Sequence, residues 1–240
     1  MYTYYLLDHN YLLDEAHGFG EFGHLLAFNP GSRDAELKIT LFFEKGEPLT
    51  FTQKAPAGKS TESNYSKWPI QPGVRFAMQV ESTEPIACQS TVGWNVTLNN
   101  YAPDAKTQSP LGIRECALSY MAIPRLAQDW YLADGIVIDN PESIYVRESE
   151  YAFVLNPGEQ PAQVTLALHY DDVVEHPTVV PARQLKVLHM DDIARRNAHY
   201  GVHFRADRPV AVQWQRVVQW YNSLEKMCYW SVPCVPGPLA

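Results

Sequence analysis

The sequence has few cysteines and no long apolar run. Its four cysteines, Cys88, Cys116, Cys228 and Cys234, form no C-x-x-C pair and sit in apolar, strand-like segments. This setting predicts buried free thiols rather than disulfides or metal ligands. No stretch approaches the ~18 uninterrupted apolar residues of a membrane helix, and the first residues lack the basic and apolar regions of a signal peptide. We therefore expect a cytoplasmic protein without membrane insertion.

Positive charge is also scarce. Lys and Arg number 19 against 27 Asp and Glu, which gives a formal net charge of −8. A nucleic-acid backbone would be repelled by this charge, so nucleic acid is disfavoured as a partner. Hydrophobic residues reach 46% and charged residues only 19%, which excludes a disordered chain and predicts a packed core.

Catalytic signatures are missing as well. The chain contains no G-x-S-x-G, P-loop or G-x-G-x-x-G motif, and none of its eight histidines forms H-E-x-x-H or a cluster at ligand spacing. We therefore assign no catalytic residue, no metal site and no cofactor, and we favour a protein that is not an enzyme.

What the sequence does contain is an internal repeat. The segment Phe28–Gly31 recurs as Leu155–Gly158, and both copies are followed by a strand whose apolar residues alternate with polar ones. Further blocks recur in the same order. They are residues 5–8 with 131–134, 56–59 with 181–184, 76–80 with 200–204, 84–89 with 208–213, and 120–124 with 229–233. Chance does not keep so many blocks collinear.

Each copy therefore supplies six or seven short strands punctuated by Pro and Gly, the pattern of a β-sandwich. We predict an all-β fold of two tandem antiparallel, jelly-roll-like β-sandwich modules, residues 1–129 and 130–240, related by duplication. In each N-P-G turn we expect Pro to preset φ and Gly to accept a positive φ. The only helix-like stretch is Met190–Arg196, for which one or two turns are expected.

The second copy resembles the sensory rhodopsin transducer family of small bacterial β-sandwich proteins. The resemblance rests on motifs spread over residues 130–220: Trp130 followed by Ala133-Asp134-Gly135, Val154-Leu155-Asn156-Pro157-Gly158, His169-Tyr170-Asp171-Asp172, Val180-Pro181-Ala182-Arg183, and Asp207-Arg208-Pro209-Val210-Ala211-Val212-Gln213. The first copy is similar but degraded, with Tyr5 in place of the family's Trp. The resemblance implies single modules that assemble as ring-like oligomers and act as binding or signal-transducing units, with sugars suggested as ligands. Because this chain carries two modules, the corresponding assembly is a homodimer of four modules.

Candidate ligand contacts are polar residues that recur in both copies. Asp8 pairs with Asp134, and Glu21 pairs with Glu148. An ionised carboxylate makes strong hydrogen bonds to sugar hydroxyls. The alternative is a turn cap for each Asp and a cross-strand ion pair for each Glu.

Amide, guanidinium and indole groups complete the candidate set. Gln89 and Gln213 point away from the apolar face, and Gln215 continues the row, which suits either a neutral polyol or a solvated strand face. Arg183 and Arg216 suit an anionic ligand, a pair with Glu148, or plain surface exposure. Trp130 and Trp94 could stack on a sugar, although a Trp in strand phase is more often core.

We expect a protein that binds a small polar molecule such as a carbohydrate and relays that state through oligomer contacts, with the second copy as the functional one. Two alternatives stay open. An enzyme of carbohydrate metabolism using Glu21 or Glu148 predicts a carboxylate of strongly raised pKa in a deep pocket. A purely structural assembly protein predicts no pocket and a large apolar patch between modules.

Overall fold

Antiparallel strands make up nearly all of the regular structure. The computed structural model describes residues 1–14, 19–71, 73–97, 113–139, 147–219 and 227–237, with side chains described for residues 1–9, 23–71, 73–92, 119–138, 149–217 and 231–237. Within these residues the helical elements are two 3-10 turns, η1 (Tyr65–Lys67) and η3 (Met190–Asp192). The predicted all-β fold class is thus confirmed, and the helix-like stretch Met190–Arg196 is reduced to a three-residue turn. None of the described segments is a helix that could cross a membrane.

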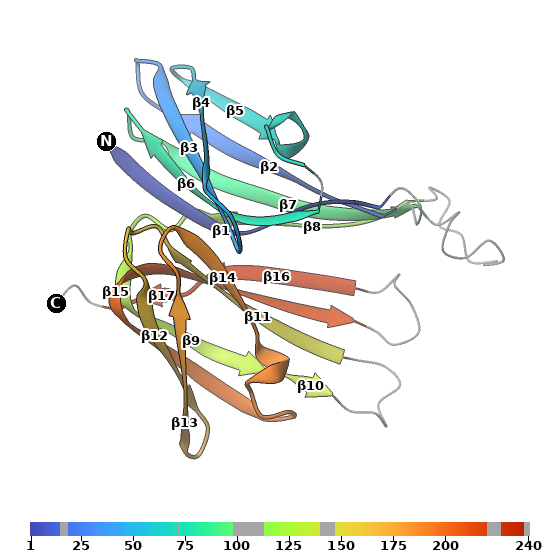
Figure 1. Ribbon diagram of the computed structural model, residues 1–240. Coiled ribbons are helices and arrows are strands. Elements are labelled where there is room, and N and C mark those ends of the chain that lie inside the picture. The colour runs from blue at the N-terminus through green and yellow to red at the C-terminus, as the bar shows by residue number, and fades with distance from the viewer. Residues whose placement is uncertain (15–18, 72, 98–112, 140–146, 220–226, 238–240) are drawn as a thin grey trace.

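The first module consists of two sheets packed face to face, in the upper half of Figure 1. Its strands are β1 (Tyr2–Asp14), β2 (Phe19–Asn29), β3 (Ala35–Phe43), β4 (Leu49–Ala55), β5 (Lys59–Asn64), β6 (Val74–Ser82), β7 (Ala87–Thr97) and β8 (Ile113–Met121). One sheet has the order β4-β3-β6-β1, the other β5-β2-β7-β8, and the last residues of β1 cross over to pair with β2. Apolar side chains such as Leu6, Ile39 and Leu25 fill the space between the sheets.

The second module has the same architecture and lies in the lower half of Figure 1. Its strands are β9 (Ala127–Ile136), β10 (Ile138–Asp139), β11 (Arg147–Asn156), β12 (Ala162–His169), β13 (Val173–Val180), β14 (Gln184–His189), β15 (His199–Gln219), β16 (Met227–Pro233) and β17 (Val235–Pro236). Strand β15 belongs to both sheets: its first part pairs with β12 and β9, and its second part with β11 and β16. The single strand β15 therefore corresponds to both β6 and β7 of the first module. The predicted boundary between residues 129 and 130 falls inside β9 and stays a prediction.

Strand pairing repeats residue by residue between the modules. In the first, Leu41 of β3 faces Met78 of β6, and in the second, Leu168 of β12 faces Val202 of β15. Both pairs sit at the same offset from the N-P-G turns, so Met78 and Val202 occupy equivalent places. The alternating strands predicted after those turns are confirmed, since Leu37 and Val164 are both buried.

The first strand of each module also carries the same irregularity. Between Leu6 and His9, β1 has one residue more than its partner β6, and β9 has the same extra residue between Leu132 and Gly135. Such a bulge bends the strand and increases its twist. An irregularity kept at one place in both halves supports duplication more strongly than shared strands do.

The strand registers confirm the block of residues 5–8 with 131–134 and correct two other details of the sequence comparison. Tyr4, not Tyr5, is the counterpart of Trp130, because Tyr4 faces Val80 where Trp130 faces Phe204. The last block is out of register by three residues. Ser119 faces Thr91 and Ser231 faces Gln215, at equivalent places of the pairing with β7 and β15. The counterpart of Ser231 is therefore Ser119, because bulky aromatic residues near both strands misled the alignment.

The N-P-G turns are held by their asparagines. The Asn29 side chain accepts a hydrogen bond from Gly31 N at 3.0 Å and donates to Arg33 O and Ala55 O. Asn156 makes the equivalent bonds, including one from Gly158 N at 3.0 Å. The predicted positive φ of the turn glycines is wrong, because neither glycine has one. The buried Asn side chain supplies the hydrogen bonds that define the turn.

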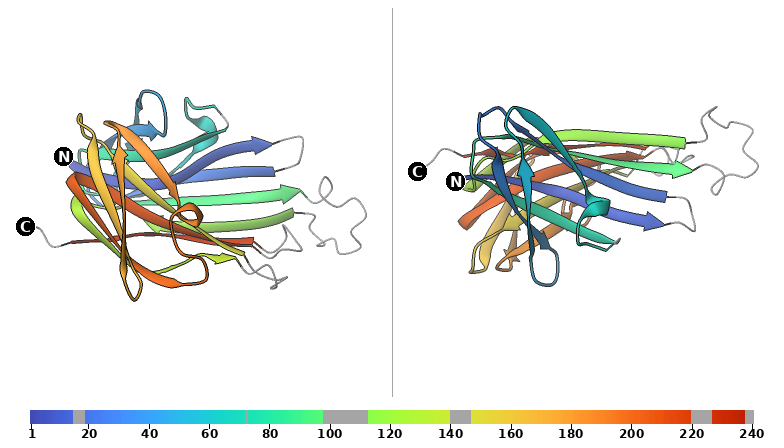
Figure 2. Two further views of the ribbon diagram at one scale, coloured as in Figure 1. Left: turned by 60° about the horizontal axis from the view of Figure 1, so that its bottom comes forward. Right: turned by 90° about the horizontal axis from the view of Figure 1, so that it is seen from above.

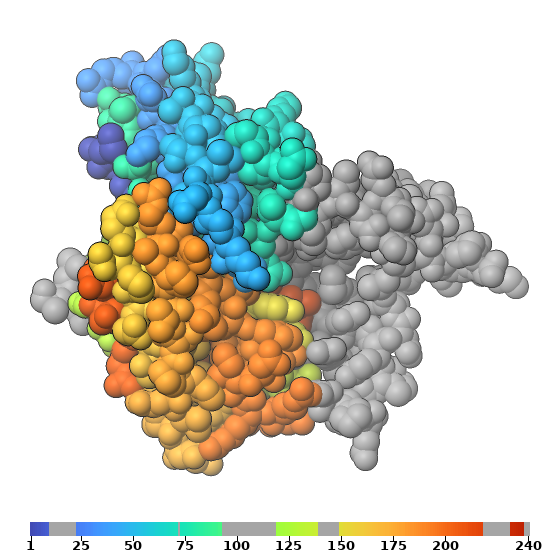
Figure 3. Space-filling model, viewed as in Figure 1, coloured from blue at the N-terminus to red at the C-terminus, as the bar shows by residue number. Residues whose placement is uncertain are grey.

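The two modules meet along a partly polar contact that we call the seam. It joins β1, β3, β6 and β8 of the first module to β11, β14, β15 and β16 of the second. The two halves lie side by side in Figure 2 and touch in the space-filling view of Figure 3. Apolar first-module side chains at the seam belong to the core cluster of the second module. They are Tyr5, Leu7, Phe42, Ala77 and Ile123. Phe42 is buried although it faces away from the core of its own sandwich, because the second module covers it.

Buried hydrogen bonds cross the seam. The Leu7 backbone N–H donates to Gln213 Oε1 at 3.1 Å, and Gln215 Nε2 donates to Asp8 Oδ2 at 2.8 Å. Gln213 in turn donates to Ser231 Oγ at 2.8 Å. Asp8 is only 1% exposed, and burial raises the pKa of its carboxyl to about 6, against the opposing effect of the Ser231, Arg75 and Gln215 groups. The seam therefore holds a carboxyl group that ionises near neutral pH.

Asp8 should make stability depend on pH. Its folded pKa of about 6 lies above the usual value of 3.8 for an aspartate. The stability that the protonated Asp8 carboxyl contributes is therefore fully present below pH ~4 and is lost as pH rises through about 6. The loss is of the order of 3 kcal/mol in the free energy of unfolding. Urea titrations at pH 4 to 7 should show a decline in the wild-type chain that is much smaller in Asp8→Asn, which keeps an acceptor for Gln215. The exposed counterpart variant, Asp134→Asn, should decline like wild type. Parallel curves for wild type and Asp8→Asn would contradict the assignment.

Candidate functional site

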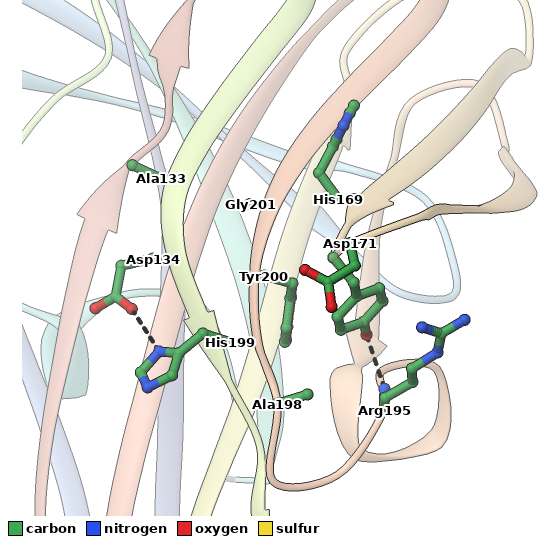
Figure 4. Close-up of a pocket in the computed structure, with 10 residues that line it drawn as sticks. Ala133, Asp134, His169, Asp171, Arg195, Ala198, His199, Tyr200 and Gly201 are labelled. Atoms are coloured by element: carbon green, nitrogen blue, oxygen red, sulfur yellow. Dashed lines mark hydrogen bonds and ion pairs between the residues drawn. The ribbon is translucent and has the colours of Figure 1, made fainter.

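A polar hollow of about 610 Å³ opens on the second module. It lies where β9 and the start of β15 meet the turn after β12 and the loop after η3 (Figure 4). Ten residues line it: Ala133, Asp134, His169, Tyr170, Asp171, Arg195, Ala198, His199, Tyr200 and Gly201. The bulge in β9 and the tight β12–β13 turn bring these segments together.

Charged groups of both signs face each other across the hollow. Asp134 and His199 lie together on one side, with His199 Nδ1 and Asp134 Oδ1 3.6 Å apart, and Asp171 and Arg195 lie on the other (Figure 4). Arg195 is held in place from outside, because Asp172 binds its guanidinium with both carboxylate oxygens, at 2.6 and 2.7 Å. This pairing holds the pKa of the Asp172 carboxyl below its usual range. The hollow thus offers acceptors and donors in fixed positions.

Aromatic rings form the floor. Tyr170 and Tyr200 have ring centroids 5.4 Å apart, and the Arg195 guanidinium lies 4.7 Å from the centroid of Tyr170. The Arg195 backbone N–H also donates to the Tyr170 hydroxyl at 2.8 Å. Tyr200 can lie flat across β9 only because residue 135 is glycine, since a Cβ there would come within 2.4 Å of its ring. Ring faces of this kind can pack on the C–H surface of a sugar.

Beneath the floor lies a buried ion pair. Arg216 Nε donates to Glu150 Oε1 at 2.7 Å, and the Tyr200 hydroxyl and Ile136 N–H donate to Glu150 Oε2 at 2.5 and 2.9 Å. Burial raises the pKa of the Glu150 carboxyl despite these donors, and burial together with Glu150 raises that of Tyr200. Glu150 is fully buried and has both oxygens occupied. It therefore supports the hollow rather than lining it.

Arg216 connects this ion pair to the rim. Its Nη2 donates to the Asp134 backbone oxygen at 2.9 Å, and its Nη1 lies 3.4 Å from Asp134 Oδ2. The chain Glu150–Arg216–Asp134 thus runs from the interior to the surface, and it fixes the rim carboxylate relative to the Tyr200 ring.

The first module has a different cluster at this place. Tyr65, a fully buried ring, bonds through its hydroxyl to His9 Nδ1 and Ser90 Oγ, both at 2.8 Å, while Tyr120 donates to the Asp8 backbone oxygen at 2.7 Å. Burial lowers the pKa of His9 to about 3, so its ring is neutral. The register places Gly23 and Val92 where the second module has Glu150 and Arg216. At these two positions the first module therefore has no counterpart of the Glu150–Arg216 ion pair.

The structure brings two of the predicted site residues to the hollow and gathers three others at the seam. Asp134 lines the hollow, and Arg216 lies directly beneath it. The seam buries Asp8 of the first module together with Gln213 and Gln215 of the second. Gln215 hydrogen-bonds to Asp8, and Gln213 hydrogen-bonds to the Leu7 backbone. Their polar groups are occupied by protein partners.

The remaining predicted residues lie apart from the hollow. Trp130 is fully buried, and its indole N–H donates to Val210 O at 3.0 Å. Arg183 takes a positive φ of 56° at the place of Gly58, and its guanidinium pairs with Glu159 at 3.0 Å. Gln89 is half-buried on an open face of the first module. The side chains of Glu21, Glu148 and Trp94 lie outside the described residues. The ligand role of these side chains stays a prediction.

Sequence reasoning missed the residues that make the site. Glu148 was chosen as the candidate carboxylate in place of Glu150. Glu150 lies in strand phase with the buried Ala152 and Val154, and an acidic residue in that phase indicates a buried partner. The lining residues Asp171 and Arg195 were not among the candidate ligand contacts. The described residues contain no group of three or more His, Cys, Asp or Glu that could hold a metal ion. Cys88 and Cys234 are buried free thiols, as predicted.

Breaking the Glu150–Arg216 pair should be costly. Glu150→Ala or Arg216→Val alone leaves one charge buried without its partner, so each should lower the free energy of unfolding by about 3–5 kcal/mol. The double variant removes both charges and approaches the Gly23 and Val92 arrangement of the first module, so it should cost clearly less than the sum. Urea denaturation of the four proteins gives this cycle. Strictly additive effects would show that the pair is not coupled.

Comparison with known proteins places the second module. Residues 127–230 match the family model described as Anabaena sensory rhodopsin transducer. No curated protein matches the chain. A solved structure titled "Crystal Structure of Thermotoga maritima 1070" is 16% identical, with a TM-score of 0.40 over 46% of this chain and 95% of that one. A structure of the Anabaena sensory rhodopsin transducer is 21% identical, with a TM-score of 0.32 over 37% of this chain and 86% of that one. The family model thus confirms the resemblance that the motifs of the second copy predicted, over residues 127–230.

Proposed function

We propose that the protein is a non-enzymatic, transducer-like binding protein whose second module holds a small polar molecule, such as a carbohydrate, in the hollow. The observation that carries this proposal is the pair of carboxylates, Asp134 and Asp171, that line the same hollow together with His199. Two acceptors and an imidazole around a tyrosine floor suit a ligand with several hydroxyl groups. The mixed charge does not favour a simple anion or cation.

The buried Glu150–Arg216 ion pair beneath the hollow supports the proposal, because it fixes the side chains that line the hollow. Glu150 and Arg216 hold Tyr200 and Asp134 from below, and Asp172 holds Arg195 from the side. A ligand therefore meets groups that are already oriented, which lowers the entropic cost of binding. The neutral cluster of the first module offers no such support, so we place the main ligand site in the second module, residues 130–240.

The match to the transducer family supports relay of the bound state to a partner. The Anabaena relative carries the name of a sensory rhodopsin transducer; for this chain we propose signal relay in the cytoplasm without assigning a receptor.

Ligand binding is testable by thermal shift. We expect one or more members of a panel of neutral sugars, polyols and sugar acids to raise the melting temperature, since a ligand at ~100 times its dissociation constant adds about 2.7 kcal/mol. Asp134→Ala and Asp171→Ala should each remove at least half of the shift, whereas Glu175→Ala, which removes an exposed carboxylate of β13 outside the hollow, should keep it. A panel without any shift would refute binding of this ligand class, and an undiminished shift in both hollow variants would move the site elsewhere.

We further propose that two chains associate into a homodimer of four modules. Exposed apolar side chains on both modules support this proposal, among them Phe28 at 45%, Met121 at 55% and Val235 at 65% exposure. Sedimentation velocity at micromolar concentration should give the mass of two 27.2-kDa chains. A single-chain mass up to about 100 µM would rule out an assembly of ordinary affinity.

A further inference from the structure

A smaller pocket lies at one end of the seam, and we call it the seam pocket. Its volume is about 390 Å³, within the range of cavities that hold small molecules. The first module contributes Gln79 of β6, and the link between the modules contributes Leu126. The second module contributes its N-P-G turn, residues 156–160, together with Arg208 and Pro209 of β15. The pocket therefore has its complete wall only while the two modules are docked, and it shares no lining residue with the hollow around Tyr200.

The wall of the seam pocket is mainly apolar. Leu126, Pro157 and Pro209 supply this surface, and Leu126 also packs against the core of the second module. The two proline rings have a fixed backbone φ, so this part of the wall is rigid. Mainly apolar pockets with a few polar groups, placed where two domains meet, are the usual sites of small ligands.

Arg208 brings a positive charge to this wall. Within the part of the chain that the structure describes, the guanidinium of Arg208 and the amide of Gln79 form no hydrogen bond or ion pair. The acidic residue of the wall, Glu159, is paired with Arg183 at 3.0 Å instead. A guanidinium binds a carboxylate through two parallel hydrogen bonds, and an amide can add a third. Each module thus offers a hydrogen-bond donor to the same pocket.

The repeat identifies Glu84 as the counterpart of Arg208. The residues that precede these two, Thr83 and Asp207, each accept a hydrogen bond from a backbone N–H at the equivalent place after an N-P-G turn, at 2.9 and 2.8 Å. The same position of the repeat therefore carries a negative charge in the first module and a positive charge in the second.

In the first module this position is neutralised by the chain itself. Glu84 pairs with Arg33 of the N-P-G turn at 2.6 Å. The counterpart of Arg33 is Gln160, because Asn29 and Asn156 donate to the backbone oxygens of these two residues. Gln160 carries no charge. The second module has thus reversed the charge at one position and lost the charged partner at the other, which suits a partner that comes from outside the chain.

We propose that the seam pocket binds a small organic acid, with its carboxylate on Arg208 and Gln79. The apolar body of the acid then packs on Leu126 and on the two prolines of the wall. The neighbouring Glu159 carboxylate favours a singly charged anion over a dianionic phosphate, because like charges repel.

Such a ligand bridges the two modules, since Gln79 belongs to the first and Arg208 to the second. It binds the docked arrangement and has no complete site in a chain whose modules are apart. Binding therefore stabilises the seam by linkage. This site is separate from the hollow of the second module, so its occupancy does not depend on the sugar-like ligand proposed above.

Benzoate and hexanoate are the probes for the seam pocket, and benzamide and hexanamide are uncharged controls of the same shape. We expect at least one of the two acids to bind the full chain saturably in calorimetric titrations, with a dissociation constant below about 10 mM. Its amide should bind at least about tenfold more weakly, because it loses the charge-assisted hydrogen bonds. No saturable binding of either acid in this range would overturn the proposal.

Matched variants place the bound acid. Arg208→Gln removes the charge and should weaken binding at least about tenfold, and Gln79→Ala, on the other module, at least about twofold. Arg205→Gln removes the same charge from an exposed position of β15 outside the seam pocket, so it should bind the acid like wild type. Asp134→Ala should also leave acid binding unchanged, which separates this site from the hollow. Circular dichroism and melting temperatures check that all four variants fold.

Two results would count against this site. Equal weakening by Arg208→Gln and Arg205→Gln would mean that the acid is attracted by net positive charge and not by the pocket. An unchanged affinity in Arg208→Gln would place the acid elsewhere. Either result would overturn the seam pocket as an acid site and leave the proposed function of the hollow standing.

Discussion

The buried contact of Asp8 with Gln215, together with the Leu7–Gln213 bond beside it, determines how the two modules are arranged. A polar group removed from water must find a partner, and an unpaired one costs about 1–3 kcal/mol. The apolar part of the seam specifies the arrangement less strictly. Its side chains, among them Tyr5, Leu7 and Ile123, make non-directional contacts, which would allow one module to shift along the other. The two hydrogen bonds are satisfied in one register only. The seam therefore specifies an arrangement as well as contributing stability.

The two modules share a backbone and differ in what they bury. In the first, His9, Tyr65 and Ser90 form a neutral cluster, and in the second, Glu150 and Arg216 form a buried ion pair. A buried pair of this kind adds little net stability, because desolvation offsets most of its Coulombic gain. Its retention in one module alone points to positioning: it holds Tyr200 and the Asp134 rim where the hollow opens. Duplication supplied two equal scaffolds, and the interiors then diverged.

Sequence alone predicted the sandwiches because period two and recurring turns are local signals. Asn29 and Asn156 mark the same turn from the sequence, and their side chains make the same hydrogen bonds in both modules. The candidate site was less predictable because burial depends on distant parts of the chain. Asp8 and Asp134 are one residue type at one position of the repeat, yet the first is 1% exposed and the second lines an open hollow. No feature of the neighbouring sequence distinguishes the two aspartates. Asp8 is buried because the second module covers it, whereas Asp134 is not covered.

The recurrence of Asp8/Asp134 and Gln89/Gln213 in both copies has two physical explanations, a ligand site in each module or a repeated contact surface. At the seam the surface explanation accounts for two of the four groups, since Asp8 and Gln213 each hydrogen-bond to the other module. Asp134 and Gln89 are the two groups left over. Asp134 is exposed and lines the hollow, so it alone of the four has the position that a ligand contact needs.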